Sequence, residues 1–290
     1  MPLSEAQRRF ADAVRRPEDE IDLVGAALAF ARVEHPDLDE PACRTAIAEV
    51  AARAADAVAA ENEPRRRVRA LAGAFADAGF DGNRDDYYDP ANSYLHEVVR
   101  RRRGLPISLS VVLIEVGRSA GVPLYGVALP AHFMVKWQDG EDELFLDPFH
   151  GCEVLDEKAC RARIRAMVGG RMPLAPVHFA RVGPRAILRR MLNNLRGLHL
   201  QRQDLPRAVR TVELLLVLDP DAPGDLRDLG LLYRYSDRDR EAVVCLERYL
   251  ELAPNAPDAE TVRRNLEMLQ RRRSDAGPED ASRDSAPPRA

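Results

Sequence analysis

His132 and Asp147 are the two residues whose types and spacing could support acid–base chemistry. They lie in residues 130–149, PAHFMVKWQDGEDELFLDPF, where polar and apolar residues alternate on both sides of an Asp-Gly pair. Such alternation predicts two β-strands, and Asp139-Gly140 is a typical two-residue hairpin turn. In that register His132 directly opposes Asp147, with Cβ atoms roughly 4.5 to 5.5 Å apart. The carboxylate could then orient the imidazole, as in the base and orienting acid of a catalytic triad; the alternative is an ordinary exposed cross-strand pair.

A nucleophile for this pair is expected at the start of a helix that precedes the hairpin. Pro106, two residues after Gly104, pre-sets the first turn of a helix that ends near Gly121. Ser108 lies in the first turn, where backbone N–H groups and the helix dipole favour an anion. Ser108 is therefore the candidate nucleophile, provided that His132 lies within about 3 Å as its base. Alternatively, its hydroxyl caps the helix. The apolar positions that mark this helix as central are Leu109, Val112, Leu113 and Val116.

Three elements follow one another in a recognisable order. A helix begins after a Gly and closes with AGVP, the next strand carries His132, and the strand after it ends in Asp147-Pro148. This order resembles the transglutaminase-like, papain-type core, with its Cys-helix, His-strand and Asp-strand. More narrowly, DYYDPANSYL, RRGLPISLSVVLIEVGRSAGVPLYGVALPAHF and FLDPF resemble the SirB-type bacterial proteins, which join this core to tetratricopeptide repeats. The resemblance covers most of the chain, including EIDLVGAALAFARVEHPDLD near its start.

The sequence departs from this family at the nucleophile. In active transglutaminase-like enzymes a Cys stands two residues after the Gly at the head of the central helix, and here that position is Pro106. The resemblance therefore implies a core without classical Cys-dependent activity. Cys152 follows Asp147 on the wrong element to replace that Cys, and we expect it to pack in the core. A metal site formed by His132, Asp147 and His150 is a further alternative, but we predict neither a metal nor a cofactor.

Four helices are expected before residue 80, and they form an N-terminal helical bundle over residues 1–80. Ser4 and Gln7 are a capping-box signature for the first helix. Proline and aspartate mark the other starts, which are predicted at Pro17, at Asp39 with Pro41, and at Pro64. A polar loop at residues 79–90 and a helix at about residues 90–103 follow. The transglutaminase-like core is predicted to span residues 81–184.

The C-terminal part repeats with a period of 34 residues. Pro220 and Pro254 are separated by this interval, and the same offset relates Ala208 to Ala242. This is the period of tetratricopeptide repeats, helix-turn-helix units that usually bind protein segments. Since two repeats are fewer than the three normally needed to stand alone, the alternative is that they only extend the core. The predicted segments are repeats at 187–220 and 221–254, a last helix at 259–271, a repeat region at 185–272 and a disordered tail at 273–290.

Composition narrows the class of protein. The chain has 290 residues, 46% of them hydrophobic, and a net charge of -4 from 43 basic and 47 acidic side chains. Runs of Arg are interleaved with acidic segments, so no basic face for nucleic acid is predicted. The four cysteines lack metal-finger spacing, and no apolar run approaches the ~20 residues of a membrane span. We therefore expect a cytoplasmic protein that binds neither nucleic acid nor membranes.

These patterns predict an α+β protein that is mostly helical, with an N-terminal helical bundle, a papain-like transglutaminase-type core with a small antiparallel sheet, and C-terminal tetratricopeptide repeats. Two functions are compatible with them. The first is a regulatory or scaffold protein without Cys-dependent activity that binds protein or peptide partners through its core and repeats. The second is an acyl-transfer or hydrolytic enzyme acting on an amide or peptide. In that enzyme Ser108 attacks the carbonyl, His132 takes the proton and Asp147 orients the imidazole.

Overall fold

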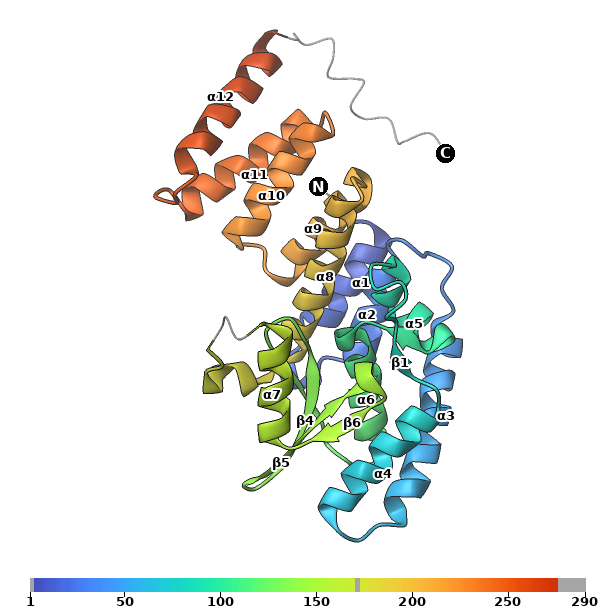
Figure 1. Cartoon of the computed structure of the whole chain (residues 1–290). Helices are drawn as coiled ribbons and strands as arrows, with labels where there is room; N and C mark the ends of the chain where they lie inside the picture. The colour runs from blue at the N-terminus through green and yellow to red at the C-terminus, as the bar shows by residue number, and fades with distance from the viewer. Residues whose placement is uncertain (1–2, 170–172, 276–290) are drawn as a thin grey trace. The chain divides into compact units, whose positions relative to one another are not determined.

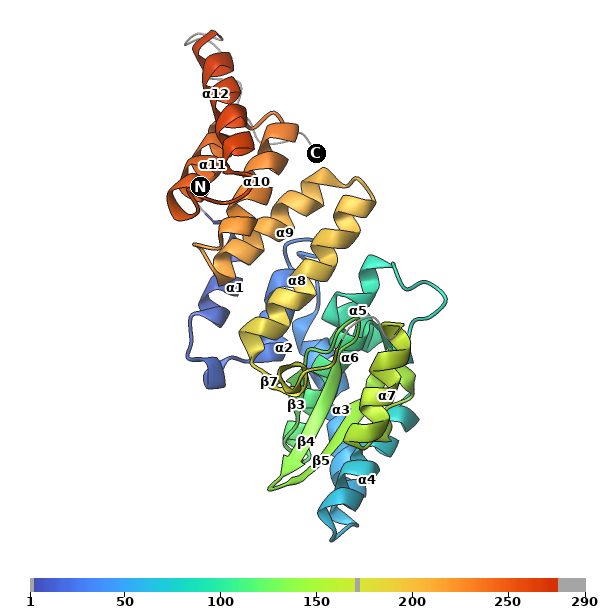
Figure 2. The same ribbon diagram turned by 60° about the vertical axis from the view of Figure 1, so that its left-hand side comes forward.

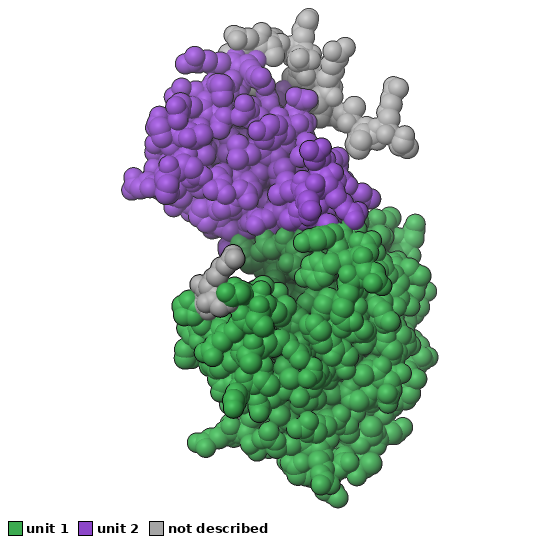
Figure 3. All heavy atoms as spheres, in the orientation of Figure 1, with its two compact units in different colours: residues 1–194 green, residues 195–290 purple. Residues whose placement is uncertain are grey.

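The computed structural model describes residues 3–169 and 173–275 and confirms a mostly helical α+β fold (Figure 1). The chain divides into two compact units, residues 1–194 and residues 195–290 (Figure 3). The first unit contains the sheet together with the helices that precede it. None of the helices formed by the described residues combines the length and the apolar composition that a membrane span requires.

Four α-helices open the first unit, and three of them begin at the residues that the sequence indicates. Ser4 and Gln7 form the capping box of the first helix, the Asp39 side chain caps the third, and Pro64 opens the fourth. These caps bind backbone N–H groups that a helix start leaves without partners. The four helices are α1 (Glu5–Val14), α2 (Leu23–Ala31), α3 (Glu40–Ala59) and α4 (Pro64–Asp77).

The second helix begins later than predicted. Pro17 precedes only a short 3-10 turn, Glu18–Glu20. Helix α2 starts after Asp22, whose carboxylate accepts a hydrogen bond from the Gly25 N–H at 2.9 Å. An Asp cap stabilises a helix start by about 1 kcal/mol, which Pro17 cannot match because its side chain accepts no hydrogen bond.

The central helix α6 (Pro106–Ser119) begins at Pro106 as predicted. The single helix predicted at 90–103 is instead a 3-10 turn, Pro90–Asn92, followed by a separate α-helix. That helix stops at Arg102, which has a left-handed φ of 54°. The chain thereby turns into a short strand that leads to α6. The elements between α4 and α6 are β1 (Asp81–Gly82), α5 (Leu95–Arg101) and β2 (Arg103–Gly104), and β1 pairs with β2 in parallel.

A five-stranded antiparallel sheet of order β6-β5-β4-β3-β7 forms the rest of the core (Figure 2). One face packs against α7 (Glu157–Met167), where Met134 and Phe145 lie in one cluster with Cys160 and Ile164. The alternate strand residues are buried too, so both faces are covered; they include Val135, Trp137, Leu144 and Leu146. The strands are β3 (Tyr125–Val127), β4 (Met134–Asp139), β5 (Asp142–Asp147), β6 (Glu153–Leu155) and β7 (Arg181–Val182).

The predicted hairpin of β4 and β5 forms, but in a different register. Asp139 pairs with Asp142, so the two-residue loop begins at Gly140 rather than at Asp139. Gly140 has a φ of 58°, a left-handed conformation that glycine adopts without strain and that tight hairpin loops need at their first position. The prediction that His132 directly opposes Asp147 is therefore wrong, because each strand is shifted by one residue.

The C-terminal helices follow the predicted repeat pattern. Ala208 and Ala242, which are one period apart, are both fully buried in the core of the second unit. The repeats differ at one cap, since Asp204 caps its helix through the side chain whereas the equivalent Arg238 does not. The helices are α8 (Pro184–Gln201), α9 (Leu205–Leu218), α10 (Pro223–Tyr235), α11 (Asp239–Leu252) and α12 (Ala259–Asp275).

The last helix is longer than predicted. Helix α12 continues to Asp275, so the first three residues of the tail predicted to be disordered, 273–275, are helical. The remainder of that predicted tail, residues 276–290, lies outside the described residues.

Candidate functional site

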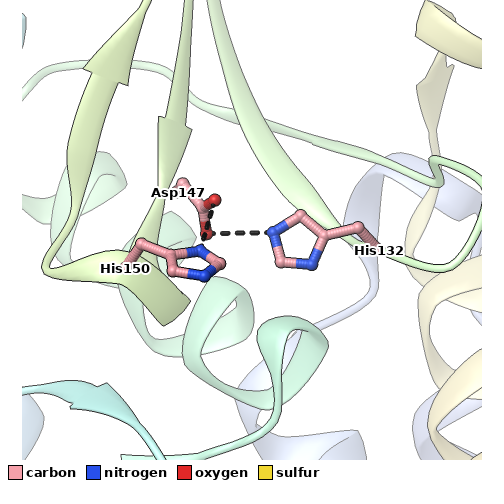
Figure 4. A group of neighbouring side chains, drawn as sticks. All are labelled: His132, Asp147 and His150. Carbon is pink, nitrogen blue, oxygen red and sulfur yellow. Dashed lines mark hydrogen bonds and ion pairs between the residues drawn. The ribbon is translucent and has the colours of Figure 1, made fainter. Parts of the chain in front are cut away.

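His132 and Asp147 meet through their side chains although the sheet does not pair them (Figure 4). His132 Nε2 lies 3.0 Å from Asp147 Oδ1, and the two residues are 2% and 0% exposed. Side chains alternate between the two faces of a strand, so shifting both strands by one residue leaves His132 diagonal to Asp147 on the same face. The predicted contact therefore forms by a different route, and it is buried rather than an exposed cross-strand pair.

A strained turn directs His132 toward β5. Ala131 has a φ of 57°, in the left-handed region that alanine rarely adopts. The His132 N–H donates to the Leu129 carbonyl at 3.2 Å. Arg190 donates to the carbonyl oxygens of Leu129 at 3.2 Å and of His132 at 2.8 Å. These hydrogen bonds hold the turn closed and thereby fix the position of the imidazole.

Asp147 accepts hydrogen bonds from four groups. Its Oδ1 accepts from His132 and from the Phe149 N–H at 3.2 Å, while its Oδ2 lies 2.8 Å from His150 Nδ1 and accepts from Arg163 at 2.9 Å. Burial alone raises the pKa of this carboxyl, but the hydrogen bonds that the carboxylate accepts from His132 and Arg163 outweigh this effect. The pKa of Asp147 therefore lies well below its ordinary value, and the group is an anion.

Two of these partners enter the site in different ways. His150 is brought back by the 3-10 turn Pro148–His150, which Asp147 itself caps. The short spacing in Asp-Pro-Phe-His is a local signal for this contact, although the sequence places His150 only in the alternative metal site. Arg163 comes from α7 and also binds Glu153. No local motif marks Arg163, so sequence reasoning missed it.

The second ring nitrogen of His132 has no partner. Nδ1 is buried and makes no hydrogen bond to any described residue. Because Nε2 faces an anionic carboxylate, we assign the proton to Nε2, which leaves Nδ1 as an acceptor. An unsatisfied buried acceptor costs about 1 to 3 kcal/mol. His132 therefore has the tautomer of a general base, but no described residue donates a hydrogen bond to its Nδ1.

Ser108 is committed to the backbone at the start of α6. Its hydroxyl lies 2.6 Å from the Asn92 carbonyl, to which it donates, and it accepts from the Leu105 N–H at 3.0 Å. An added Cβ at Gly104 would lie 2.8 Å from the hydroxyl oxygen, so glycine makes room for this contact. Ser108 is fully buried and makes no hydrogen bond to His132 in the described part of the chain. Its geometry is that of the capping alternative.

The thiols offer no replacement nucleophile. Pro106 occupies the first position of α6, where it carries no reactive group. Burial raises the pKa of Cys43 and of Cys245 to about 11 and that of Cys160 to about 12, and it raises the pKa of Cys152 as well. The thiolate is the reactive form, and these raised pKa values keep all four thiols protonated near neutral pH.

The donor atoms of His132, Asp147 and His150 lie within 4.8 Å of one another. Those nitrogens already face the Asp147 oxygens at hydrogen-bonding distance, and Arg163 places a positive charge on the same carboxylate. A metal ion would have to displace these bonds and would be repelled by the guanidinium. The arrangement is that of a hydrogen-bonded ion-pair cluster.

Comparison with known families agrees with this architecture. Residues 41–193 match the model of the transglutaminase-like superfamily. The chain belongs to the transglutaminase-like superfamily. Residues 195–267 match a tetratricopeptide repeat model, which confirms the repeats predicted from the 34-residue period. No solved structure matches the chain.

Several bacterial relatives resemble the chain over most of its length. A UPF0162 protein of Xylella fastidiosa is 36% identical over 264 residues, which cover 88% of this chain and 92% of the relative. A UPF0162 protein of Vibrio cholerae is 29% identical and covers 87% of this chain and 93% of itself. Protein SirB1 of Salmonella typhimurium is 24% identical, over 67% of this chain and 72% of its own. The resemblance of this superfamily member to SirB-type proteins is thereby confirmed.

Proposed function

We propose that this transglutaminase-like protein is a regulatory or scaffold protein that binds protein partners through its core and its repeats and has no Cys-dependent activity. One observation carries the proposal: among the described residues, neither a thiol nor a hydroxyl is hydrogen-bonded to the free Nδ1 of His132. A base without a nucleophile cannot start acyl transfer. On this proposal the protein is cytoplasmic, and its partners are proteins rather than nucleic acid or membranes.

The retained His132–Asp147 pair is explained by stability rather than by catalysis. Asp147 joins β5 to α7 through Arg163 and to the turn before β4 through His132. A buried carboxylate with four donors ties together segments that are distant in the sequence. Removing it would leave the two imidazoles without their anion and Arg163 with Glu153 alone, which is costly in a protein interior.

The repeats supply the surface for partners on this proposal. Tyr235 on α10 and Val244 on α11 are 70% and 65% exposed, and exposed large apolar side chains are common in interfaces. A photo-crosslinking amino acid at position 235 should link the protein to one defined partner, whereas the same group at the exposed Arg271 on α12 should not. The cross-link should survive His132→Ala, because binding does not use the imidazole.

Intact-mass spectrometry after exposure to a cysteine-directed and a serine-directed electrophile tests the lack of catalysis. We expect no adduct on the folded protein, since three thiols are buried, Cys245 is partly buried, the pKa of all four is raised, and Ser108 is a cap. In urea the four cysteines should each take up iodoacetamide, which is the control for reagent quality. An adduct on the folded wild type that disappears in His132→Ala would overturn the proposal.

A second candidate function, acyl transfer or hydrolysis by Ser108, His132 and Asp147, rests on the unpartnered Nδ1. It requires the Ser108 hydroxyl to leave the Asn92 carbonyl and turn toward His132. A serine-directed adduct on Ser108 that depends on His132 would support it. Unchanged turnover of a hydrolysed peptide by Ser108→Ala would count against it.

A further inference from the structure

A cavity of about 450 Å³ lies in the first compact unit, apart from the His132 cluster. This volume lies within the range of ligand pockets. The cavity is floored by apolar side chains from four elements: Ile21 before α2, Ile114 of α6, Leu124 and Tyr125 at β3, and Ile187 of α8. Ile21, Leu124 and Ile187 are 7%, 6% and 2% exposed. The apolar side chains at the bottom of the cavity are therefore continuous with the buried core.

The rim of this cavity is acidic. Asp19 and Glu20 line it and are exposed, and their carboxylates make no ion pair or hydrogen bond with any residue that the structure describes. Asp22 and Glu115 also line it, but each is bound by an arginine: Asp22 by Arg44 and Glu115 by a neighbour on its own helix. Two carboxylates are therefore available to a ligand.

The nearby cations do not neutralise these two carboxylates. Arg118, which also lines the cavity, binds Glu115 through two nitrogens. Arg185 on α8 binds Glu18, and Arg181 on β7 stacks over the Tyr125 ring at 3.7 Å and donates to Gln138. The lining itself holds four carboxylates and one guanidinium, which leaves a net negative charge. The negative rim and the apolar floor are complementary to a ligand that is both cationic and aliphatic.

We propose that this cavity binds a protein segment in which a lysine or arginine lies next to an aliphatic side chain. The aliphatic side chain would contact the apolar residues at the bottom of the cavity. The basic group would reach Asp19 and Glu20 while its methylene groups pack against the apolar lining. The inference rests on the proposed function, because it names the chemistry of one partner segment for the core. It does not involve His132, and the α8 residues that line the cavity, Pro184 and Ile187, precede residues 195–267, which match the repeat model.

Fluorescence anisotropy with two labelled peptides tests this site. Arg-Leu-Arg-Ile-Arg-Gly should bind the full-length protein saturably and more weakly at high salt, and Glu-Leu-Glu-Ile-Glu-Gly should not bind. The double variant Asp19→Lys/Glu20→Lys should weaken binding of the basic peptide about tenfold or more. The matched control is Glu49→Lys/Asp56→Lys, which changes the net charge equally at two exposed positions of α3 outside the cavity lining.

The control pair should bind the basic peptide within about twofold of the wild type, since neither position lines the cavity and salt screens exposed charges that make no direct contact. Equal losses in both double variants would mean that net charge alone attracts the peptide and would overturn the proposal. Absence of saturable binding, or unchanged binding by Asp19→Lys/Glu20→Lys, would overturn it as well. Circular dichroism checks that each variant is folded.

A second variant tests the apolar floor. Ile114→Ala removes partly exposed aliphatic surface from the cavity, and we expect binding of the basic peptide to weaken about threefold to tenfold. Unchanged binding would leave only an electrostatic contact and would refute the two-part site. The peptide-binding results test this site alone. The proposal that the protein is not catalytic would be overturned instead by a His132-dependent adduct in the electrophile experiment.

Discussion

Two histidines of the first compact unit share one feature and differ in their partners. His132 and His96 each have a buried Nδ1 without a hydrogen-bond partner among the described residues. His132 Nε2 lies 3.0 Å from Asp147, whereas His96 Nε2 is 3.8 Å from Glu97. His96 also lies against the ring of His35, with 4.7 Å between centroids. One imidazole is held by an anion and the other is packed among rings.

The difference is one of charge environment. Burial, and then the charge of His35, lowers the pKa of His96 to about 4, because Glu97 compensates only in part and Arg100 and Arg32 add positive charge. His96 is therefore neutral at physiological pH. In the His132 cluster it is the carboxylate whose pKa is lowered, so that an anion is kept inside the core. Burial alone does not decide what a histidine can do; the nearest charged partner does.

The largest effect is expected from removing that anion. Asp147→Ala should lower the free energy of unfolding by about 3 to 5 kcal/mol, because a buried ion-pair cluster loses the carboxylate that His132, His150 and Arg163 share. Urea unfolding at pH 7 measures it. Asp142→Ala is the control on the same strand, since its exposed pair with Arg65 is worth less than about 1 kcal/mol. Similar losses in both variants would contradict the role assigned to Asp147.

The next effect concerns pH. Since the pKa of His96 is lowered from 6.5 to about 4 on folding, the unfolded chain binds more protons between these values. The contribution of neutral His96 to the free energy of unfolding should be fully present above pH 6.5. It should fall by about 3 kcal/mol as the pH drops toward 4. In His96→Gln this loss should be absent. Urea unfolding from pH 7 to pH 4 measures the slopes, and parallel slopes would refute the assignment.

The His132 cluster should respond in a lower pH window. The pKa of Asp147 is lowered from 3.8, so its contribution is present above pH 4 and is lost as the pH falls further. Asp147→Asn should therefore flatten the stability curve below pH 4 and not between pH 4 and 6.5. A flattening in the upper window would mean that the two sites are coupled.

A smaller effect separates the two buried serines of α6. Ser108→Ala removes the hydrogen bonds of the hydroxyl to the Leu105 N–H and the Asn92 carbonyl, which keep only their 3.3 Å bond to each other. The loss of these two bonds should cost about 1 to 3 kcal/mol. Ser110→Ala should cost less than about 1 kcal/mol, because the Ser110 hydroxyl makes a single hydrogen bond within the described residues, to the Pro106 carbonyl. The two variants are compared by the urea concentration at the midpoint of unfolding. A cheaper Ser108→Ala would show that its hydroxyl is not the cap.

The smallest effect tests the strained turn before His132. Ala131→Gly relieves a left-handed alanine but adds freedom to the unfolded chain, and it should stabilise the protein by less than about 1 kcal/mol. Ala52→Gly, at an exposed position of α3, should destabilise it by about 1 kcal/mol. Opposite signs in thermal or urea unfolding are the expected result. Equal destabilisation would mean that Ala131 carries no strain.

Much of the fold could be predicted from the sequence because the signals for helix starts and repeats are local. Asp39, Pro64 and Pro106 mark helix starts through their own backbone or side-chain chemistry, and the 34-residue period marks the repeats. The hairpin was also readable, but its register depended on whether the loop began at Asp139 or Gly140. That choice is decided by cross-strand packing as well as by turn preference.

The sequence by itself determined the order of elements, the superfamily, the replacement of the expected Cys by Pro106, and the neighbourhood of His132 and Asp147. The last survived an incorrect register because a shift of one residue in both strands leaves the two side chains on the same face. Only the tertiary structure decided that the Ser108 hydroxyl binds the backbone and that Arg163 reaches Asp147. In both cases, groups that are separated in the chain come together only after packing and then compete for the same hydrogen-bonding partner. The local sequence does not show which group forms the bond.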